Sequence, residues 1–383
     1  MVRKRGFAGT VASADVTSPP PAVPADAATG PVSVRTITTD EHLAHLRALD
    51  SASFLQTPAW ARVKPEWRPE SLGFFAGDHR IGVGLVLHRR LPRLKKTLAY
   101  LPEGPVLDWA RADLSDQLAA MTKHLQAGGA FAVRMGPPVI TRRWAATTLK
   151  AAIADEALTR LVDVPADSED PAGVRVEKLL RDAGWIHQAG EGGFTAGQPQ
   201  YNFQLPLGGT EEDLLKGMNQ QWRRNIKKAA KEGVEVTRGG RGDLASFHGI
   251  YVETAGRDSF TPRPRGYFET MFDALNAEDP DRMRLYLAHH EGDLVAATTM
   301  VRVGTHAWYS YGASTTAKRD VRGSNAIQWQ MIRDALAAGA TVYDLRGITD
   351  TLDSDDPHLG LIQFKVGTGG EAVEYAGEWD LPL

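Results

Sequence analysis

Residues 309–314 read Tyr-Ser-Tyr-Gly-Ala-Ser, residues 323–329 read Gly-Ser-Asn-Ala-Ile-Gln-Trp, residues 343–347 read Tyr-Asp-Leu-Arg-Gly, and residues 364–367 read Phe-Lys-Val-Gly. The first stretch predicts a strand, and the second opens an amphipathic helix. The third stretch predicts another strand, and the fourth a turn that carries a lysine. This order of strand, loop, helix and strand is typical of an α/β fold, so the last fifth of the chain decides the fold class.

The pattern of apolar and turn residues predicts a similar order of elements in both halves of the chain. In the first half we expect strands or helices at residues 32–37, 40–49, 74–76, 81–86, 98–101, 115–125 and 131–134. In the second half we expect helices at 211–232, 244–255 and 267–275, a β-meander over 283–312, a helix at 325–338 and a strand at 342–345. Residues 140–185 are expected to be mostly helical. Two related α/β domains are therefore predicted.

The composition limits the classes of function. A chain of 383 residues is long enough for two domains, and 42% hydrophobic and 24% charged residues are ordinary for a globular protein. The net charge of −3 gives no overall field that attracts nucleic acid, so any RNA site must be a local basic cluster. Cysteine is absent, which excludes disulfides and thiolate nucleophiles and fits a reducing compartment.

The first thirty residues predict a disordered tail. Residues 1–30 are rich in Ala, Pro, Ser and Thr and have no apolar periodicity. Residues 3–5 are basic, but no apolar run of signal-peptide length follows them. No stretch of eighteen apolar residues occurs in the sequence, so no membrane span is predicted. We therefore expect a cytoplasmic protein.

Five cations fall within the helix predicted over residues 211–232. They are Arg223, Arg224, Lys227, Lys228 and Lys231. Spacings of three and four place most of them along one side of the helix. Such a row binds the phosphates of RNA or of a substrate diphosphate, but a run of this kind is also typical of a solvated helix face. The residues alone leave both interpretations open.

Two further positions are candidate phosphate sites. Residues 260–267 read Phe-Thr-Pro-Arg-Pro-Arg-Gly-Tyr, and the two prolines hold Arg263 and Tyr267 rigidly near a helix start. An arginine fork there matches a diphosphate, although it could equally bond loop carbonyls. Lys365, between Phe364 and Val366, could reach a phosphate or a terminal ribose, but by itself it is typical of a surface lysine.

A catalytic base is not evident. The sequence holds no paired carboxylates and no nucleophile motif of the G-x-S-x-G kind. His289, His290 and Glu291 have no further ligand at a metal-binding spacing, so we predict a turn there and no metal site.

Several separated stretches resemble, in the same order, motifs of the FemABX family of aminoacyl-tRNA-dependent transferases that make peptidoglycan interpeptide bridges. The stretches are residues 53–60 with Lys64, 100–108, 223–234, 263–268, 323–329 and 364–367. The resemblance implies two tandem GNAT-like acyltransferase domains. It places domain 1 at residues 31–197, completed by the C-terminal segment 368–383, and domain 2 at residues 198–367.

The resemblance also implies roles for the candidate residues. By motif match, the acceptor's diphosphate and sugar are bound by Lys64, Arg263, Tyr267 and one of Tyr309 and Tyr311. Phe364 and Lys365 match a motif associated with the aminoacyl-tRNA acceptor end, which makes them the candidate catalytic residues. Arg223, Arg224, Lys227, Lys228 and Lys231 are the expected tRNA-binding or phosphate-binding residues.

This sequence departs from the family pattern at two places, and from the cofactor motif of ordinary acetyltransferases at a third. Some relatives carry a helical coiled-coil arm where residues 291–293 here predict a tight turn, so we expect no arm. Some relatives have an aspartate where Gly136 stands here, so that position supplies no base. In the stretch that matches the cofactor motif of ordinary acetyltransferases, Asp320 is expected to repel a diphosphate and Asn325 to crowd it, which disfavours acetyl-CoA.

The sequence therefore predicts an aminoacyltransferase that moves an amino acid, by resemblance glycine, from aminoacyl-tRNA to the stem-peptide amine of a peptidoglycan precursor. The acceptor is either lipid II, met at the inner face of the plasma membrane through peripheral contact, or a UDP-linked muropeptide. No cofactor is expected besides aminoacyl-tRNA as co-substrate, and no DNA partner. Three alternatives stay open: tRNA-dependent transfer to an antibiotic scaffold, an acetyl-CoA-dependent acyltransferase, and an RNA-binding module without activity.

Overall fold

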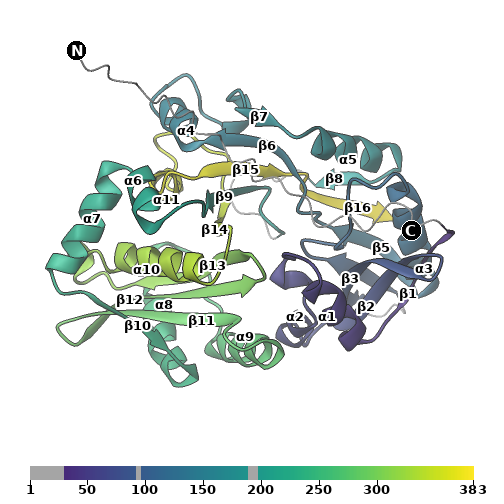
Figure 1. The fold of residues 1–383 in the computed structure, drawn as a ribbon, viewed down its shortest axis with the longest axis horizontal. Helices are drawn as coiled ribbons and strands as arrows, with labels where there is room; N and C mark the ends of the chain where they lie inside the picture. Colours follow the sequence, from purple (N-terminus) through teal and green to yellow (C-terminus); the bar gives the residue numbers. More distant parts are fainter. Residues whose placement is uncertain (1–29, 92–95, 189–196) are drawn as a thin grey trace, which may run out of the picture.

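The computed structural model describes residues 30–91, 96–188 and 197–383. The predicted tail lies outside these residues apart from Gly30. The chain forms two β-sheets, one of seven strands and one of nine, with helices packed against both (Figure 1). Every helix in the described ranges is too short or too polar to cross a lipid bilayer.

The first sheet and the helices around it are formed by the predicted elements of the first half. Their order is β1 (Val32–Thr36), α1 (Thr39–Arg47), α2 (Pro58–Val63), β2 (Arg68–Ala76), β3 (His79–Arg90), β4 (Thr97–Leu101), α3 (Leu114–Ala127) and β5 (Ala130–Met135). Strands β1 to β4 form an antiparallel meander, and β5 joins β4 in parallel after the crossover helix α3. The turn between β2 and β3 contains Gly77, whose positive φ of 58° the tight hairpin requires.

The second sheet, together with the helices around it, repeats this order. It contains β10 (Glu235–Gly239), α8 (Leu244–Arg257), α9 (Arg265–Glu278), β11 (Met283–His290), β12 (Asp293–Val303), β13 (His306–Ser314), α10 (Gly323–Ala337) and β14 (Val342–Ile348). Strands β10 to β13 are antiparallel, and β14 joins β13 in parallel after α10. The two sheets thus form tandem GNAT-like domains, as predicted. A two-residue turn joins β11 to β12, so no coiled-coil arm is inserted there.

The two sheets do not divide the chain at the predicted domain boundary. The C-terminal segment enters both sheets: β15 (Glu371–Tyr375) pairs with β9 (Tyr201–Pro206) and β6 (Ile140–Ala145) in the second sheet. After only two residues, β16 (Glu378–Pro382) lies between β5 and β8 (Ile186–Gln188) in the first sheet. The short strand β7 (Ser168–Glu169) also belongs to the second sheet.

The prediction of mostly helical structure over residues 140–185 is wrong for β6. Helices α4 (Ala146–Ile153) and α5 (Pro171–Asp182) are present, but β6 is an inner strand of the second sheet. Its two adjacent arginines hide the strand pattern, since Arg142 pairs with Glu374 and Arg143 with Glu371, both on β15. These partners lie more than 200 residues away, so no local window reveals the strand.

Two other predicted elements differ in detail. The helix expected over residues 211–232 is two helices, α6 (Glu211–Gly217) and α7 (Gln220–Lys231). Met218 is extended between them, and the Asn219 side chain accepts a hydrogen bond from the backbone N–H of Trp222, which starts α7 afresh. The predicted lysine-bearing turn is the last turn of a short helix, α11 (Leu359–Val366).

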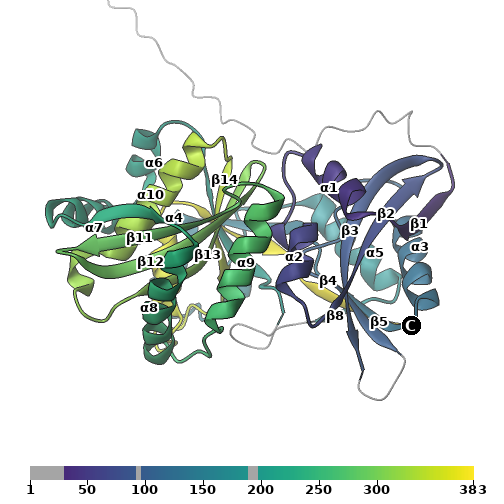
Figure 2. The ribbon, with the colours of Figure 1, turned by 90° about the horizontal axis from the view of Figure 1, so that it is seen from below.

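The domains meet through helices α2 and α9, which lie side by side between the two sheets (Figure 2). An apolar cluster joins Phe54 and Trp60 of the first domain to Met271, Leu275 and Trp308 of the second. Since all five side chains are buried, this cluster holds the domain interface together.

Gln56, from the opening motif of the resemblance, positions a loop. Its side chain is fully buried, donates to the carbonyl of Pro102 at 2.7 Å and accepts from the backbone N–H of Leu85 at 2.8 Å. A Cβ on Gly104 would lie 2.3 Å from the Gln56 amide carbon, so the loop after β4 needs a glycine there. The motif residue is therefore structural.

Trp379 anchors the C-terminal strand in the first core, where its side chain is fully buried. We expect Trp379→Ala to lower the free energy of unfolding by about 3–5 kcal/mol, because a large cavity replaces the indole. Urea denaturation measures this loss. Ile186→Ala, on the neighbouring strand but 54% exposed, is the control and should change stability by less than about 0.5 kcal/mol. Equal losses from both variants would contradict this role of Trp379.

Candidate active site

Strand β13 brings two tyrosines to opposite faces of the second sheet. The register with β12 shifts between Thr299 and Met300, which pair with Tyr311 and Tyr309 respectively. This β-bulge breaks the alternation of side chains. Tyr311 therefore packs against α8 and α9, whereas Tyr309 packs against the core cluster that includes α10. The sequence could not distinguish these two tyrosines, and the bulge does.

Four of the predicted substrate-binding residues lie together at the junction of α2, α9 and β13. Lys64 Nζ lies 5.1 Å from the ring centre of Tyr267, and the Arg263 guanidinium lies 4.9 Å from the same centre. The hydroxyl of Tyr311 donates to that of Tyr267 at 3.3 Å. We call Lys64, Arg263, Tyr267 and Tyr311 the cation–tyrosine cluster. It joins residues that are up to 247 positions apart in the sequence.

The electrostatics of this cluster favour an anion. Burial lowers the pKa of Lys64, and the neighbouring Arg263 lowers it further. Burial raises the pKa of Tyr267, so its hydroxyl stays neutral and able to donate. Neither Lys64 nor Arg263 forms an ion pair with a carboxylate in the described part of the chain. The Glu66 carboxylate acts on Lys64 only from outside ion-pair distance and raises its pKa, which opposes the shift, so two adjacent cations that form no ion pair with a described residue suit a diphosphate.

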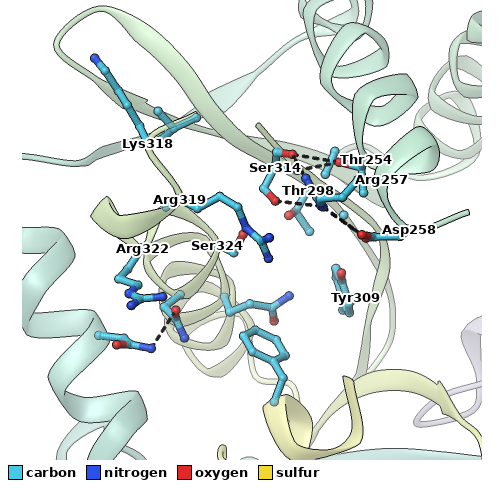
Figure 3. A pocket seen from close by; sticks show the side chains of 18 residues that line it. Thr254, Arg257, Asp258, Thr298, Tyr309, Ser314, Lys318, Arg319, Arg322 and Ser324 are labelled. Carbon is cyan, nitrogen blue, oxygen red and sulfur yellow. Dashed lines mark hydrogen bonds and ion pairs between the residues drawn. The ribbon is translucent and has the colours of Figure 1, made fainter. Parts of the chain in front are cut away.

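A cavity of about 300 Å³ opens beside β13 at the start of α10 (Figure 3). The pairing of β13 with β14 ends at Trp308 and Asp344, although β13 continues to Ser314. The two strands diverge beyond that point, and the cavity begins there. Its lining includes residues from α7, α8, β12, β13, α10 and α11, among them Asn225, Arg257, Thr298, Tyr309, Asn325 and Phe364.

The cavity wall carries cations and free hydrogen-bond donors. Figure 3 shows Arg319 reaching into the cavity, while Lys318 points away from it and pairs with Glu291 and Asp293. Among the described residues, no carboxylate pairs with Arg319 or Arg322. The α10 N-terminus adds the positive end of its dipole. The amide nitrogen of Asn325 is buried and has no partner, which indicates a polar ligand.

Asp320 and Asn325, which were expected to repel and to crowd a cofactor diphosphate, lie in different places. Asn325 lines the cavity and, through its Oδ1, accepts from Asn225 Nδ2 at 3.3 Å. Asp320 is exposed, lies 3.8 Å from Lys228 Nζ and is absent from the lining. The Asp320 carboxylate therefore lies outside the cavity lining, on the side of α7, and its expected repulsion of a diphosphate stays a prediction.

Helix α7 packs on α10 next to the cavity and presents most of its cations to solvent. Arg224, Lys227 and Lys231 are exposed and form no ion pair with any described residue, whereas Lys228 approaches Asp320. Arg223 differs, since its guanidinium donates to the carbonyl of Lys216 at 2.9 Å. The exposed cations thus lie on the same helix as Asn225, which lines the cavity.

Phe364 and Lys365 occupy different places. Phe364 lines the cavity and packs on Trp222, whose indole N–H donates to its carbonyl. Lys365 is 3% exposed and does not line the cavity. Its Nζ donates to the carbonyls of Arg346 and Gly347 on β14, at 3.2 and 2.7 Å. The sequence-based expectation of a surface lysine is wrong, because α11 turns this side chain inward.

These carbonyls belong to a bulge in β14. The register with β9 shifts between Asp344 and Gly347, and Arg346 has a positive φ of 64°. The backbone N–H of Arg346 donates to the buried carboxylate of Asp344 at 2.6 Å. The Arg346 guanidinium crosses to the first domain and pairs with Glu103 at 2.7 Å. We call Glu103, Asp344, Arg346 and Lys365 the interdomain charge network.

Sequence reasoning missed most of this network. Residues 343–347 marked Asp344 and Arg346 as part of a strand motif, but nothing local points to Glu103, 243 positions away. Arg319 and Arg322 were visible only as a loop before a glycine-led helix. Within the described ranges, no group of three or more His, Asp or Glu side chains could hold a metal ion.

Burial lowers the pKa of Lys365, Asp344 opposes this shift and Arg346 adds to it, and together they bring the pKa to about 7. Between pH 7 and the ordinary lysine value of 10.5, the unfolded chain binds a proton that the folded chain does not. We therefore expect the free energy of unfolding to rise with pH in this window for the wild type relative to Lys365→Met. Urea denaturation from pH 6.5 to 9.5 measures the difference. Lys150→Met, at an exposed lysine, controls for the lost surface charge, and a constant difference for Lys365→Met would contradict the prediction.

Comparisons with known proteins agree with this geometry. The FemAB family model matches residues 37–291 and 288–383. The chain is similar to lipid II:glycine glycyltransferases of Staphylococcus epidermidis, at 23% identity, and Staphylococcus aureus, at 24%; each match covers 91% of this chain and 92% of the relative. The crystal structure of FemX has the same fold, with a TM-score of 0.76 and 22% identity over 92% of this chain and 97% of that one. The chain belongs to the FemAB family.

Proposed function

We propose that this protein is an aminoacyltransferase that transfers glycine from glycyl-tRNA to the side-chain amine of a peptidoglycan stem peptide. One observation carries the proposal: β13 separates an unpaired cation–tyrosine cluster on one face from a cation-lined cavity that begins where β14 diverges. Two anionic substrates could then approach the same strand from two sides. The named activity of the staphylococcal relatives supports this arrangement.

In the proposed reaction, the acceptor amine attacks the carbonyl carbon of the aminoacyl ester. The C–N bond forms, the bond from carbonyl carbon to ribose oxygen breaks, and the amine proton passes to that oxygen, which leaves as the ribose hydroxyl. The ester is already activated, so positioning the two substrates supplies most of the rate enhancement. The proton can move within the substrates, which agrees with Gly136 at the position where some relatives have an aspartate.

The acceptor's diphosphate would lie between Lys64 and Arg263. The two cations approach the same tyrosine ring from nearby positions, and the tyrosine hydroxyls add neutral donors. Partial desolvation strengthens each bond to a phosphate oxygen. Tyr309 faces away from this cluster, so Tyr311 is the tyrosine proposed to contact the acceptor. A lipid-linked and a UDP-linked acceptor share the diphosphate, so both are candidates.

The tRNA acceptor end would enter the cavity beside α10. Arg319, Arg322 and the unpartnered amide of Asn325 suit its terminal phosphates, and Phe364 offers an aromatic face to its terminal base. The exposed cations of α7 extend this surface along the nucleic acid backbone. Lys365 would act by positioning. Its two hydrogen bonds hold the β14 bulge, which follows the point where β14 and β13 diverge.

An acetyl-CoA-dependent acyltransferase is the second candidate. The position of Asp320 outside the cavity weakens one argument against a thioester with a diphosphate. This candidate and transfer to an antibiotic scaffold are separated from the proposed reaction by the choice of donor and acceptor in one assay.

The direct test incubates the protein with tRNA charged with radiolabelled glycine and either lipid II or UDP-linked pentapeptide. Label on one of these acceptors supports the proposal and identifies the acceptor. Acetyl-CoA with the same acceptors is the matched control and should give no product. Acetyl transfer without glycyl transfer would overturn the proposal, and so would intact glycyl-tRNA with neither acceptor labelled.

We expect Arg263→Ala to raise the acceptor KM about tenfold or more, because one charge-assisted contact to a phosphate is worth about 1.5–3 kcal/mol. The KM for glycyl-tRNA should stay the same. Arg265→Ala is the matched control: Arg265 is the first residue of α9, two positions after Arg263, but it pairs with Glu269 and its side chain is 57% exposed. Similar effects from both arginines, or a change only in the tRNA KM, would count against the diphosphate assignment.

The exposed cations of α7 should control the salt dependence of tRNA binding. We expect the triple variant Arg224→Ala, Lys227→Ala, Lys231→Ala to weaken tRNA binding and to reduce the slope of log affinity against log salt by up to about 2–3. Filter binding from 50 to 300 mM salt measures this slope. Lys123→Ala, Lys150→Ala, Lys178→Ala removes the same charge from other exposed positions. An unchanged slope in the α7 variant would show that α7 is only a solvated face.

A further inference from the structure

Tyr309 is the first residue of β13 beyond the segment paired with β14. Trp308 is the last residue of β13 that pairs with β14. The register shift with β12 comes directly after Tyr309. The bulge turns Tyr309 toward the cavity and away from the cation–tyrosine cluster. Its ring is therefore fixed at the point where the two strands begin to separate.

The ring has little freedom to move along the strand. A Cβ on Gly312 would lie 2.2 Å from the Tyr309 hydroxyl and 2.9 Å from two of its ring carbons. The absence of a side chain at Gly312 thus leaves the space that the Tyr309 ring occupies across the strand. Burial raises the pKa of Tyr309 to about 12, so the hydroxyl that faces the cavity stays neutral.

The cavity has an end with cations that no described carboxylate pairs with, at Arg319 and Arg322, and an end near Tyr309 where Arg257 is neutralised by its ion pair with Asp258. Figure 3 shows Arg319 and Tyr309 entering the cavity from opposite sides. Phosphates belong at the end with Arg319, Arg322 and the start of α10. The aminoacyl end of the same donor carries no phosphate, so we place it toward Tyr309 and Phe364, away from the unpaired arginines. A side chain on the aminoacyl group would need the space that the Tyr309 ring fills.

We propose that Tyr309 is the residue that restricts the transferred amino acid to glycine, by filling the space beside the aminoacyl α-carbon. This inference rests on the proposed function and adds to it the source of amino-acid selectivity. Glycine fits because its α-carbon carries two hydrogens, whereas the methyl group of alanine and the hydroxymethyl group of serine meet the ring. Steric exclusion of one such group is worth about 10–200-fold in kcat/KM.

The test uses one tRNA sequence charged separately with glycine, alanine or serine, so that tRNA recognition is constant. The measured quantity is the ratio of kcat/KM for glycine to that for alanine or serine. We expect the wild type to favour glycine at least about tenfold, and Tyr309→Ala to lower this ratio at least about tenfold. Tyr309→Phe keeps the ring and should keep most of the selectivity.

Tyr311→Ala is the matched control, because this tyrosine lies on the other face of the same strand. It should lower transfer of all three amino acids alike and leave the ratio unchanged. If Tyr309→Ala does not fold, Tyr309→Leu, which removes the far edge of the ring, takes its place and should also lower the ratio.

Two results would overturn the inference: an unchanged ratio in the Tyr309 variants, or a wild type that transfers all three amino acids equally. A wild type that transfers no amino acid from any charged tRNA contradicts the proposed function itself. The two failures are therefore distinguished by the wild-type reactions alone.

Discussion

The divergence of β13 from β14 is the constraint on which the site depends. Parallel strands in a closed sheet would satisfy each other's backbone groups and leave no room for a ligand between them. Here the ladder ends at Asp344, and the same carboxylate holds the backbone N–H of Arg346 in a bulge. Lys365 then bonds the two carbonyls that the bulge exposes. Beyond the end of this ladder, β13 borders the cavity, and buried polar groups satisfy the backbone groups that the β14 bulge leaves unpaired.

The same defect connects the site to the other domain. A positive φ at a residue other than glycine is uncommon and stores about 1–3 kcal/mol, so Arg346 must be stabilised by its surroundings. Its guanidinium pairs with Glu103, and Glu103 in turn accepts from Ser53 beside the buried Gln56. The motif at residues 53–60 therefore acts through the first domain on the geometry of a strand in the second.

The sequence predicted the repeated order of elements well, because hairpins and amphipathic helices leave local patterns. Family motifs brought Lys64, Arg263 and Tyr267 into one hypothesis, and the structure places them together. Three features had no local signal: β6, whose pattern is masked by paired arginines; the side of β13 on which each tyrosine lies, which a one-residue bulge decides; and the inward position of Lys365. Each depends on contacts between distant segments, which composition and periodicity do not encode.

The C-terminal segment has a consequence for the order of events during synthesis. Strand β16 lies between β5 and β8, so the first sheet lacks an inner strand until residues 378–382 have been made. Until then, β5 and β8 present unpaired edges that invite pairing with other chains. The N-terminal domain therefore cannot complete its fold first, as domains usually do during translation. Both domains close together when β15 and β16, separated by only Ala376 and Gly377, enter their two sheets.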